Sequence, residues 1–234
     1  LHITIRFPVA PAPVAPAPVS APTERLAGGW WSSRGLQTQS GAETVTGADG
    51  ATTRSIDVTL PVGGWFTGAV QDPAANPVDG ICITPVSASN DWDGGTTTPS
   101  NGGRAGQFET QVVIPGQYRL AVNDCGSRSG LFARGWIGRD GTSVSAFERD
   151  ALTFDVAGSG IDVGTVTLRY GTRIAGTVTD ETGAPASGIC VGVVGDDWQW
   201  VGGGNTGRDG AYTTDALPEG DWALYFNDCN ATPT

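Results

Sequence analysis

The sequence predicts an all-β protein made of tandem antiparallel β-sandwich repeats, with about seven strands in a repeat and no long helices. The chain of 234 residues carries 36 glycines and 15 prolines. This composition is typical of short strands joined by tight turns, because Gly supplies positive φ and Pro fixes φ where a hairpin bends. Two further observations point the same way: the sequence repeats itself every 105 residues or so, and apolar residues alternate with polar ones in short runs.

The chain contains an internal repeat. Residues 68–83 return as residues 176–191 at a constant offset of 108, with the shared pattern G-x-V-x-D-x(4)-P-x-x-G-I-C. A second pair of blocks, 106–108 and 116–125, returns at an offset of 104. Four residues are therefore lost between the blocks, in a segment rich in Gly, Asn and Asp that we expect to be a loop of variable length.

The sequence divides into four predicted parts. Trp31 and Ile56 precede Trp136 and Ile161 by 105 residues, so we expect the end of an earlier repeat ahead of the complete one. Before it, residues 8–22 alternate Pro with Ala and Val, which favours extended polyproline II and gives no apolar periodicity for a core. The predicted parts are a Pro/Ala-rich linker at 1–25, the C-terminal part of a first sandwich repeat at 26–62, a complete repeat at 63–169 and the N-terminal part of a further, truncated repeat at 170–234.

Strands are predicted from alternation along the complete repeat. Tyr118, Leu120 and Val122 alternate with polar or small residues, which indicates a strand with one buried face. The next repeat keeps this parity over residues 222–226. Together with a short run at Trp136, the other strands are expected at residues 65–70, 81–86, 107–113, 152–156 and 163–168.

These residues resemble a known family. The shared pattern is followed by G-x-[FY] and then by Pro and Gly ahead of a strand that begins with an aromatic residue. It is similar to the carboxypeptidase regulatory-like domain, a transthyretin-like (prealbumin-like) or Cna-B-like sandwich of Ig-like architecture, and the tandem form with cysteines resembles repeats of secreted actinobacterial proteins. The resemblance covers residues 26–234. It implies a fold more than a function, since such sandwiches serve as stalks, spacers, adhesive modules and attachments to enzymes.

Each repeat carries one pair of cysteines, Cys82 with Cys125 and Cys190 with Cys229. Because the pair recurs, a disulfide within each repeat is predicted, and reduced thiols buried at equivalent strand positions are the alternative. Cys125 and Cys229 are out of register with the alternating residues before them, so we expect them just past the strand, at the rim of the sandwich. The chain has no lysine, which excludes the Lys–Asn isopeptide bonds of Cna-B-like domains.

Charge and composition limit the partners and the location. A net charge of -11 repels phosphate backbones and anionic lipid, so no nucleic-acid partner is expected. The chain lacks an apolar run of about 18 residues, which predicts no membrane insertion within this segment. Residues 1–7 do not form a signal peptide, and we expect the chain to be an excerpt of a longer precursor. We predict a secreted, extracellular or cell-surface protein whose partner is an extracellular protein or a polysaccharide.

Little in the sequence indicates catalysis or a cofactor. His2, the one histidine, lies outside every repeat, so a triad with a histidine base is not expected. Acidic pairs occur at Asp91 with Asp93 and at Asp196 with Asp197, in Gly-rich loops. Our interpretation is solvated loop charge, with calcium binding as the second possibility and glycoside hydrolysis as the third. No cofactor and no other metal site are predicted, and the chain is not expected to be an enzyme.

Three tryptophans in the variable loop, Trp92, Trp198 and Trp200, are candidates for stacking on sugar rings. The following tryptophans lie at or beside predicted strands and are expected to pack in cores: Trp31, Trp65, Trp136 and Trp222. The first predicted function is a non-catalytic structural or adhesive module that acts as a spacer or interaction domain. The alternative is a carbohydrate-binding accessory module of a secreted glycoside hydrolase of amylase type. Exposure of the three loop tryptophans in a common plane favours the alternative, and burial or scatter favours the first.

Overall fold

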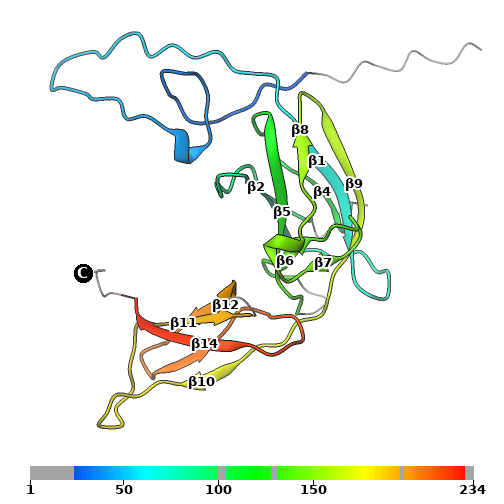
Figure 1. Cartoon of the computed structure of the whole chain (residues 1–234), viewed down its shortest axis with the longest axis vertical. Coiled ribbons are helices and arrows are strands. Elements are labelled where there is room, and N and C mark those ends of the chain that lie inside the picture. The colour runs from blue at the N-terminus through cyan, green and yellow to red at the C-terminus, as the bar shows by residue number, and fades with distance from the viewer. Residues whose placement is uncertain (1–23, 100–103, 128–130, 196–197, 230–234) are drawn as a thin grey trace, which may run out of the picture.

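The described part of the chain consists of an irregular segment followed by two β units (Figure 1). The computed structural model describes residues 24–99, 104–127, 131–195 and 198–229. The 3-10 turns that lie wholly within these residues are η1 (Gln39–Gly41) and η2 (Glu148–Asp150). None of the described helices has the length and apolar character needed to cross a membrane. The predicted all-β class is confirmed.

The first unit, residues 63–169, is a sandwich of two sheets. One sheet has the order β4-β1-β9, and the other has the order β3-β2-β5-β6-β7, with β8 also paired to β5. The strands are β1 (Trp65–Gln71), β2 (Ile81–Ser87), β3 (Thr96–Thr97), β4 (Gln107–Glu109), β5 (Gly116–Asp124), β6 (Gly135–Ile137), β7 (Val144–Ser145), β8 (Phe154–Val156) and β9 (Gly160–Thr167).

Strand β9 departs from antiparallel pairing. It runs parallel to β1, with Trp65 opposite Gly160 and Val70 opposite Val166. A parallel pair needs a long crossover connection, and here the whole second sheet lies between β1 and β9 in the sequence. The pairings between the named strands of the first unit are therefore antiparallel except for this one. A single parallel bridge also joins Ser143 to Thr167.

The core of the first unit lies between its two sheets. Tyr118, Leu120 and Val122 of β5 point into it and are at most 2% exposed, which confirms the predicted alternation. Phe66 of β1 faces them from the other sheet, with its ring edge-on to Tyr118 at 6.5 Å and to Phe154 at 5.3 Å between centroids. Edge-to-face aromatic pairs of this kind add stability beyond the area that they bury.

The second unit, residues 170–229, repeats the strand registers of the first at the sequence offsets. Cys82 lies opposite Asn123 in the first unit, and Cys190 lies opposite Asn227 in the second. Its sheets are β10-β13 and β12-β11-β14. The strands are β10 (Ala175–Thr177), β11 (Ile189–Val194), β12 (Trp200–Asn205), β13 (Ala211–Thr213) and β14 (Ala223–Asp228).

The core of the second unit is small. Its buried cluster consists of Val193, Val201 and Leu217. On β14, Phe226 corresponds to the buried Val122 of β5 and is 44% exposed, so the core face that is covered in the first unit is partly open in the second.

Strand β12 corrects the expectation that this Gly-rich stretch is a loop. Its three glycines lie where side chains would collide: a Cβ on Gly203 would come within 2.5 Å of the Val191 carbonyl, and one on Gly204 within 2.4 Å of the Thr213 carbonyl. Glycine is suited to such close backbone approach inside a strand. Trp200 therefore begins a strand.

The units are joined by residues 168–174, which are hydrogen-bonded to both. On one side the Gly171 N–H donates to the Leu131 carbonyl of the first unit at 2.9 Å. On the other, Thr172 and Leu217 of the second unit exchange two backbone hydrogen bonds, at 2.8 and 2.7 Å. The connection is thus part of the folded structure and does not behave as a free linker.

Side chains also cross between the units. Phe147 of the first unit packs against the core of the second and lies 6.2 Å from Trp222 between ring centroids. Within the connection, Tyr170 stacks on Phe132 at 5.3 Å. These contacts add apolar burial to the hydrogen bonds of the junction.

Residues 24–62 form an irregular segment, at the opposite end of the first unit from β10 to β14 in Figure 1. Within residues 24–62 the structure has isolated bridges, Leu26 with Val62 and Trp30 with Gln37, and no strand. Ile56, expected to align with a strand residue of the complete repeat, is 40% exposed. A strand requires a paired neighbour, and the assignment of 26–62 to the end of an earlier repeat stays a prediction.

Candidate functional site

A cavity of about 800 Å³, here called the inter-unit cavity, lies between the two units. Its size is within the range of small-molecule sites in proteins, about 300–1,000 Å³. Its walls come from β2, β5, β6 and η2 of the first unit and from the start of β12 in the second. Its aromatic and charged lining residues are Trp92, Trp136, Trp200, Arg119, Arg134, Arg149 and Glu148.

Two indole rings line the cavity from the first unit. Trp92 follows β2 and is anchored by a backbone bridge to Val86. Its ring lies 6.0 Å from that of Trp136 on β6, at an interplanar angle of 54°. Trp136 is half-buried, while Trp92 is 50% exposed. An exposed indole fixed in this way offers an apolar face to a ligand at little cost in side-chain entropy.

The second unit contributes Trp200, which is 57% exposed. The Arg134 guanidinium of the first unit lies 4.2 Å from the centre of its ring. Arg134 also donates to Asp215 of the second unit, with 3.1 Å between Nη1 and Oδ2. Burial lowers the pKa of Arg134, and the Asp215 charge opposes that shift. Arg134 thus ties the two units together and orients Trp200.

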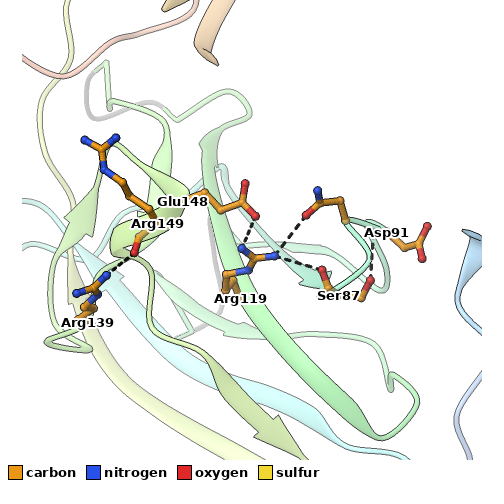
Figure 2. Close-up of polar contacts among 7 residues, drawn as sticks. Ser87, Asp91, Arg119, Arg139, Glu148 and Arg149 are labelled. Atoms are coloured by element: carbon orange, nitrogen blue, oxygen red, sulfur yellow. Dashed lines mark hydrogen bonds and ion pairs between the residues drawn. The ribbon is translucent and has the colours of Figure 1, made fainter. Parts of the chain in front are cut away.

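Arg119 is the central residue of a polar network in the first unit (Figure 2). Its Nη1 is ion-paired with Glu148, and its Nη2 donates to the Asn90 side-chain oxygen at 3.3 Å. Its guanidinium lies 5.9 Å from the Trp136 ring. Several of its donors are already occupied, so Arg119 mainly positions its neighbours.

Arg149 is oriented differently. In Figure 2 its guanidinium extends away from the pair formed by Arg119 and Glu148. It lies 4.4 Å from the centre of the Phe147 ring, and its side chain is 38% exposed. Its Nε is ion-paired with Asp150 at 3.8 Å. Its carbonyl accepts a hydrogen bond from Arg139 at 2.6 Å, which holds the backbone.

The four cysteines form one disulfide in each unit. Cys82 is bonded to Cys125 with 5.7 Å between Cα atoms, and Cys190 to Cys229 with 5.2 Å. Cys125 and Cys229 directly follow the last residues of β5 and β14 and are exposed. Both disulfides therefore lie at the rim of their sandwich and not in its centre.

The interpretation of Asp91 as solvated loop charge is wrong. Asp91 is only 9% exposed. Its carboxylate accepts hydrogen bonds from the backbone N–H of Ser40 at 3.0 Å and from the hydroxyls of Ser40 at 2.6 Å and Ser89 at 2.9 Å. These bonds, led by that of the Ser40 hydroxyl, lower the pKa of Asp91 to about 2. The charge of Asp91 thus fastens the irregular segment to the first unit, a role that sequence spacing does not reveal.

The other acidic candidates do not add up to a metal site in the part of the chain that is described. Burial, and then the Asp91 charge, raise the pKa of Asp93. Among the described residues no group of three or more His, Cys, Asp or Glu side chains could hold a metal ion. Asp196, Asp197 and His2 lie outside the described residues.

The tryptophans fall into different environments from those expected. Trp198 is 83% exposed but does not line the inter-unit cavity, so the three loop tryptophans do not share one site. The four expected in cores are all half-buried. Trp222 packs against the second core, and its Nε1 donates to the Pro218 carbonyl at 3.1 Å. Trp136 instead faces the cavity.

Sequence reasoning missed the charged half of the cavity. Arg119 had a usable signal, because it alternates with the buried Tyr118 and Leu120 and must point outward from β5. Arg134 and Arg149 carried no such signal, since their place in the cavity depends on how the second unit docks.

Comparison with known proteins gives no family. No protein-family model and no curated protein matches the chain. Among solved structures, the Bacillus anthracis TIE protein is 12% identical with a TM-score of 0.32, and the match covers 70% of this chain and 28% of that chain. A streptococcal ancillary pilin is 13% identical with a TM-score of 0.29, and the match covers 69% of this chain and 52% of that chain. A candidate carbohydrate-binding protein from Bacteroides uniformis is 12% identical with a TM-score of 0.29, and the match covers 72% of this chain and 80% of that chain. This chain spans about a quarter of the first and half of the second. A functional conclusion therefore depends on its own residues.

Proposed function

We propose that the chain is a non-catalytic, extracellular β-sandwich module that acts as a spacer or interaction domain. The junction carries this proposal: residues 168–174 are hydrogen-bonded to both units, and Phe147 packs into the core of the second. Domains joined by loose linkers move relative to one another by default. A bonded junction instead holds successive sandwiches at a fixed angle, as a spacer requires.

The repeat organisation supports the same proposal. Equivalent cysteines, strand registers and turns recur in the two units. Asp72 accepts hydrogen bonds from Ala74 and Asn76, and Asp180 is bonded in the same way 108 residues later. We assign the chain to tandem carboxypeptidase regulatory-like repeats of an actinobacterial surface protein, with 26–62 as the end of one repeat and 170–234 as the start of another. Disulfides persist in oxidising compartments, which supports a place outside the cell.

Gly171→Val is expected to loosen the junction. A Cβ at Gly171 would lie 3.0 Å from the backbone of Ala133 in the first unit and 3.0 Å from the Ala216 Cβ in the second, so a branched side chain must push the units apart. We expect small-angle X-ray scattering to show a larger maximum dimension and a broader distance distribution for the variant, with unchanged far-ultraviolet circular dichroism.

The matched control is Gly47→Val, because a Cβ at Gly47 meets nothing within 4 Å. This variant should scatter like the unchanged chain. If Gly171→Val also scatters like it, the junction does not set the angle between the units, and the spacer proposal loses its main support.

A second candidate function, carbohydrate binding as an accessory module of a secreted glycoside hydrolase, is favoured by one observation. Trp92 and Trp200 come from different units, are both at least half exposed, and line the same cavity. Exposed large aromatic side chains gathered in a concave site commonly mark ligand contact. The polysaccharide would then span both units.

A tryptophan-fluorescence screen of the full chain tests this candidate. We expect saturable quenching by at least one of starch, cellulose, chitin and polygalacturonate. Trp92→Ala and Trp200→Ala should each weaken binding by at least tenfold, about 1.4 kcal/mol. Trp198→Ala is the control, because Trp198 is the more exposed residue but lies outside the cavity. If none of the four polysaccharides quenches the fluorescence, carbohydrate binding is rejected and the spacer proposal is the one that remains.

A further inference from the structure

We propose that the chain binds a second copy of itself head to tail, with residues 26–62 of one copy completing the sandwich that residues 170–229 of the other leave open. This inference rests on the proposed assignment of 26–62 to the end of one repeat and of 170–234 to the start of another. It adds a partner, a second copy of the chain, that the spacer proposal does not name.

The sheets of the second unit have open edges. In the first unit β5 pairs with β6 and β8 in addition to β2, and β1 pairs with β9 in addition to β4. The equivalent strands of the second unit are β14 and β10. Within the described part of the chain β14 pairs with β11 alone, and β10 pairs with β13 alone. An edge of this kind is a template on which another strand can pair.

The core face of the second unit is exposed at positions that are buried in the first. Phe66 of β1 is 0% exposed, whereas Ile174 at the equivalent position is partly exposed. Val122 of β5 is 1% exposed, whereas Phe226 is 44% exposed. In the first unit, the core cluster includes these residues that follow β5: Phe132, Ile137, Val144, Val156, Val166 and Leu168. No strand follows β14 among the described residues to provide the same cover.

Residues 26–62 match the sequence of that cover. Residues 26–31 read LAGGWW and residues 132–137 read FARGWI, at an offset of 106, one more than the offset that pairs Trp31 with Trp136. Residues 56–58 and 161–163 both read IDV, at an offset of 105. In the first unit these stretches include β6 and the start of β9. They are the strands that would pair with β14 and β10.

The same segment is poorly covered in a single copy. Every residue from 42 to 60 is exposed, and in Figure 1 this stretch runs as a wide loop away from the first unit. Ile56, Val58 and Leu60 are alternate residues and are each at least 40% exposed. In a strand they would share one face. Exposed apolar residues gathered in this way indicate a partner.

The two ends of the segment already repeat the junction between the units. Four backbone hydrogen bonds of that junction have counterparts ahead of the first unit. At the junction, from N–H donor to carbonyl acceptor, they are Ala133 to Arg169, Gly171 to Leu131, Thr172 to Leu217 and Leu217 to Thr172. Ahead of the first unit they are Ala27 to Pro61, Gly63 to Arg25, Gly64 to Val113 and Val113 to Gly64. The first unit is thus prepared to carry a unit in front of it, held as the second unit is held behind it.

A single copy does not bring the two complementary parts together. Residues 24–62 and strands β10 to β14 lie at opposite ends of the first unit (Figure 1). The segment is fastened at its own end by the bonds of Asp91 to Ser40 and by an ion pair of Arg25 with Glu109 at 2.6 Å. It would have to break these bonds to reach the second unit of its own chain. A second copy brings its second unit to the segment without that cost.

One complete sandwich would then be formed from two chains. A strand added to a free sheet edge gains main-chain hydrogen bonds, and its side chains supply the specificity. The contact joins different surfaces of the two copies, and such heterologous contacts produce open chains of molecules unless the rotation closes a ring. Because the junction bonds recur, successive units in such a chain would be spaced alike.

Analytical ultracentrifugation of the full chain over a wide range of concentration is the first test. We expect the mean mass to rise with concentration and to pass that of a dimer. Each copy carries a net charge of -11, so added salt should strengthen the association by screening the repulsion between copies.

Val58→Asp should weaken this association by about tenfold or more, because it places a charge on the apolar face that the contact buries. Val45→Asp is the matched control: Val45 and Val58 are both 45% exposed and lie in the same segment, but Val45 is outside the stretch that matches β9. Both variants should keep the circular dichroism and the unfolding midpoint of the unchanged chain, since neither side chain is buried in a single copy.

Cysteine cross-linking tests the register. Thr67 of β1 lies opposite Asp162 of β9, in parallel, and the repeat offsets of 108 and 105 translate this pair into Ala175 of one copy and Asp57 of the other. Neighbouring strands lie about 4.8 Å apart, within the range of Cα separations that a disulfide spans. When Asp57→Cys and Ala175→Cys are made in separate chains, one of them tagged, and then mixed, we expect the mixed disulfide to form in preference to either symmetric one.

The outcomes are distinct. A chain that stays monomeric at every concentration overturns the inference, and so does an association that Val45→Asp weakens as much as Val58→Asp. A double variant with both cysteines that cross-links within single chains shows that the segment completes its own second unit, which also overturns it. None of these results bears on the spacer proposal, because Gly171→Val tests the junction within one copy.

Discussion

Replacing Cys82 and Cys125 together by serine is expected to lower the free energy of unfolding of the first unit by about 4 kcal/mol. The disulfide closes a loop with a sequence separation of 43, and in the chain-entropy account a loop of that length in the unfolded state is restricted by about this amount. Few native contacts should be lost with it, because Cys125 is exposed and its N–H donates to the Gly80 carbonyl whether or not the sulfur is bonded.

The measurement is guanidinium-induced unfolding followed by circular dichroism. The matched variant replaces Cys190 and Cys229, whose separation is 39. The buried cluster of the second unit has only three apolar residues, so we expect this variant to unfold the second unit selectively. Amide-exchange protection should then be lost in β11 and β14 and kept in β2 and β5. A change below about 1 kcal/mol in the first variant would show that the disulfide does not stabilise the first unit by restricting its unfolded chain.

The all-β class and the buried face of β5 are the parts of the fold that the sequence predicted best, and the division into repeats stays a prediction. Offsets of 108 and 104 identify equivalent residues, and the registers of the two units follow them: Gly68 lies opposite Phe108, and Gly176 lies opposite Tyr212. Alternation located β5 and its buried face because one side of that strand is fully covered. Periodicity is informative where one face is buried.

Two strand features could not be predicted for physical reasons. Strand β12 contains three successive glycines, which have low strand propensity, and it forms because neighbouring backbones approach too closely for any side chain. The parallel pairing of β9 with β1 depends on the crossover between sheets, and alternation alone does not distinguish parallel from antiparallel neighbours.

The candidate site could be predicted only in part, because its residues come from both units. Trp92 and Trp200 were recognised as loop aromatics, but their common cavity depends on docking through Arg134 and Asp215, which are 81 residues apart. Asp91 was misjudged for a related reason: its partner Ser40 lies 51 residues earlier, in a segment without periodicity. Local patterns do not report contacts of this kind.

Phe66→Ala is expected to destabilise the first unit by about 3–5 kcal/mol, the usual cost of removing a buried aromatic ring. Phe66 is 0% exposed and lies at the centre of the core, edge-on to Tyr118 and Phe154. The two sheets are packed around it, so the cavity left by the ring cannot collapse without moving a strand.

Phe226→Ala is the control for this prediction. Phe226 lies on β14, is 44% exposed and has one ring partner, Tyr212, at 5.8 Å, so its loss should cost about 1 kcal/mol or less. Thermal and guanidinium unfolding of both variants, with amide exchange to assign each transition to a unit, measures the difference. Similar costs for Phe66 and Phe226 would mean that the face of β14 is covered in solution, and that the second unit is more completely packed than its exposed aromatic residues indicate.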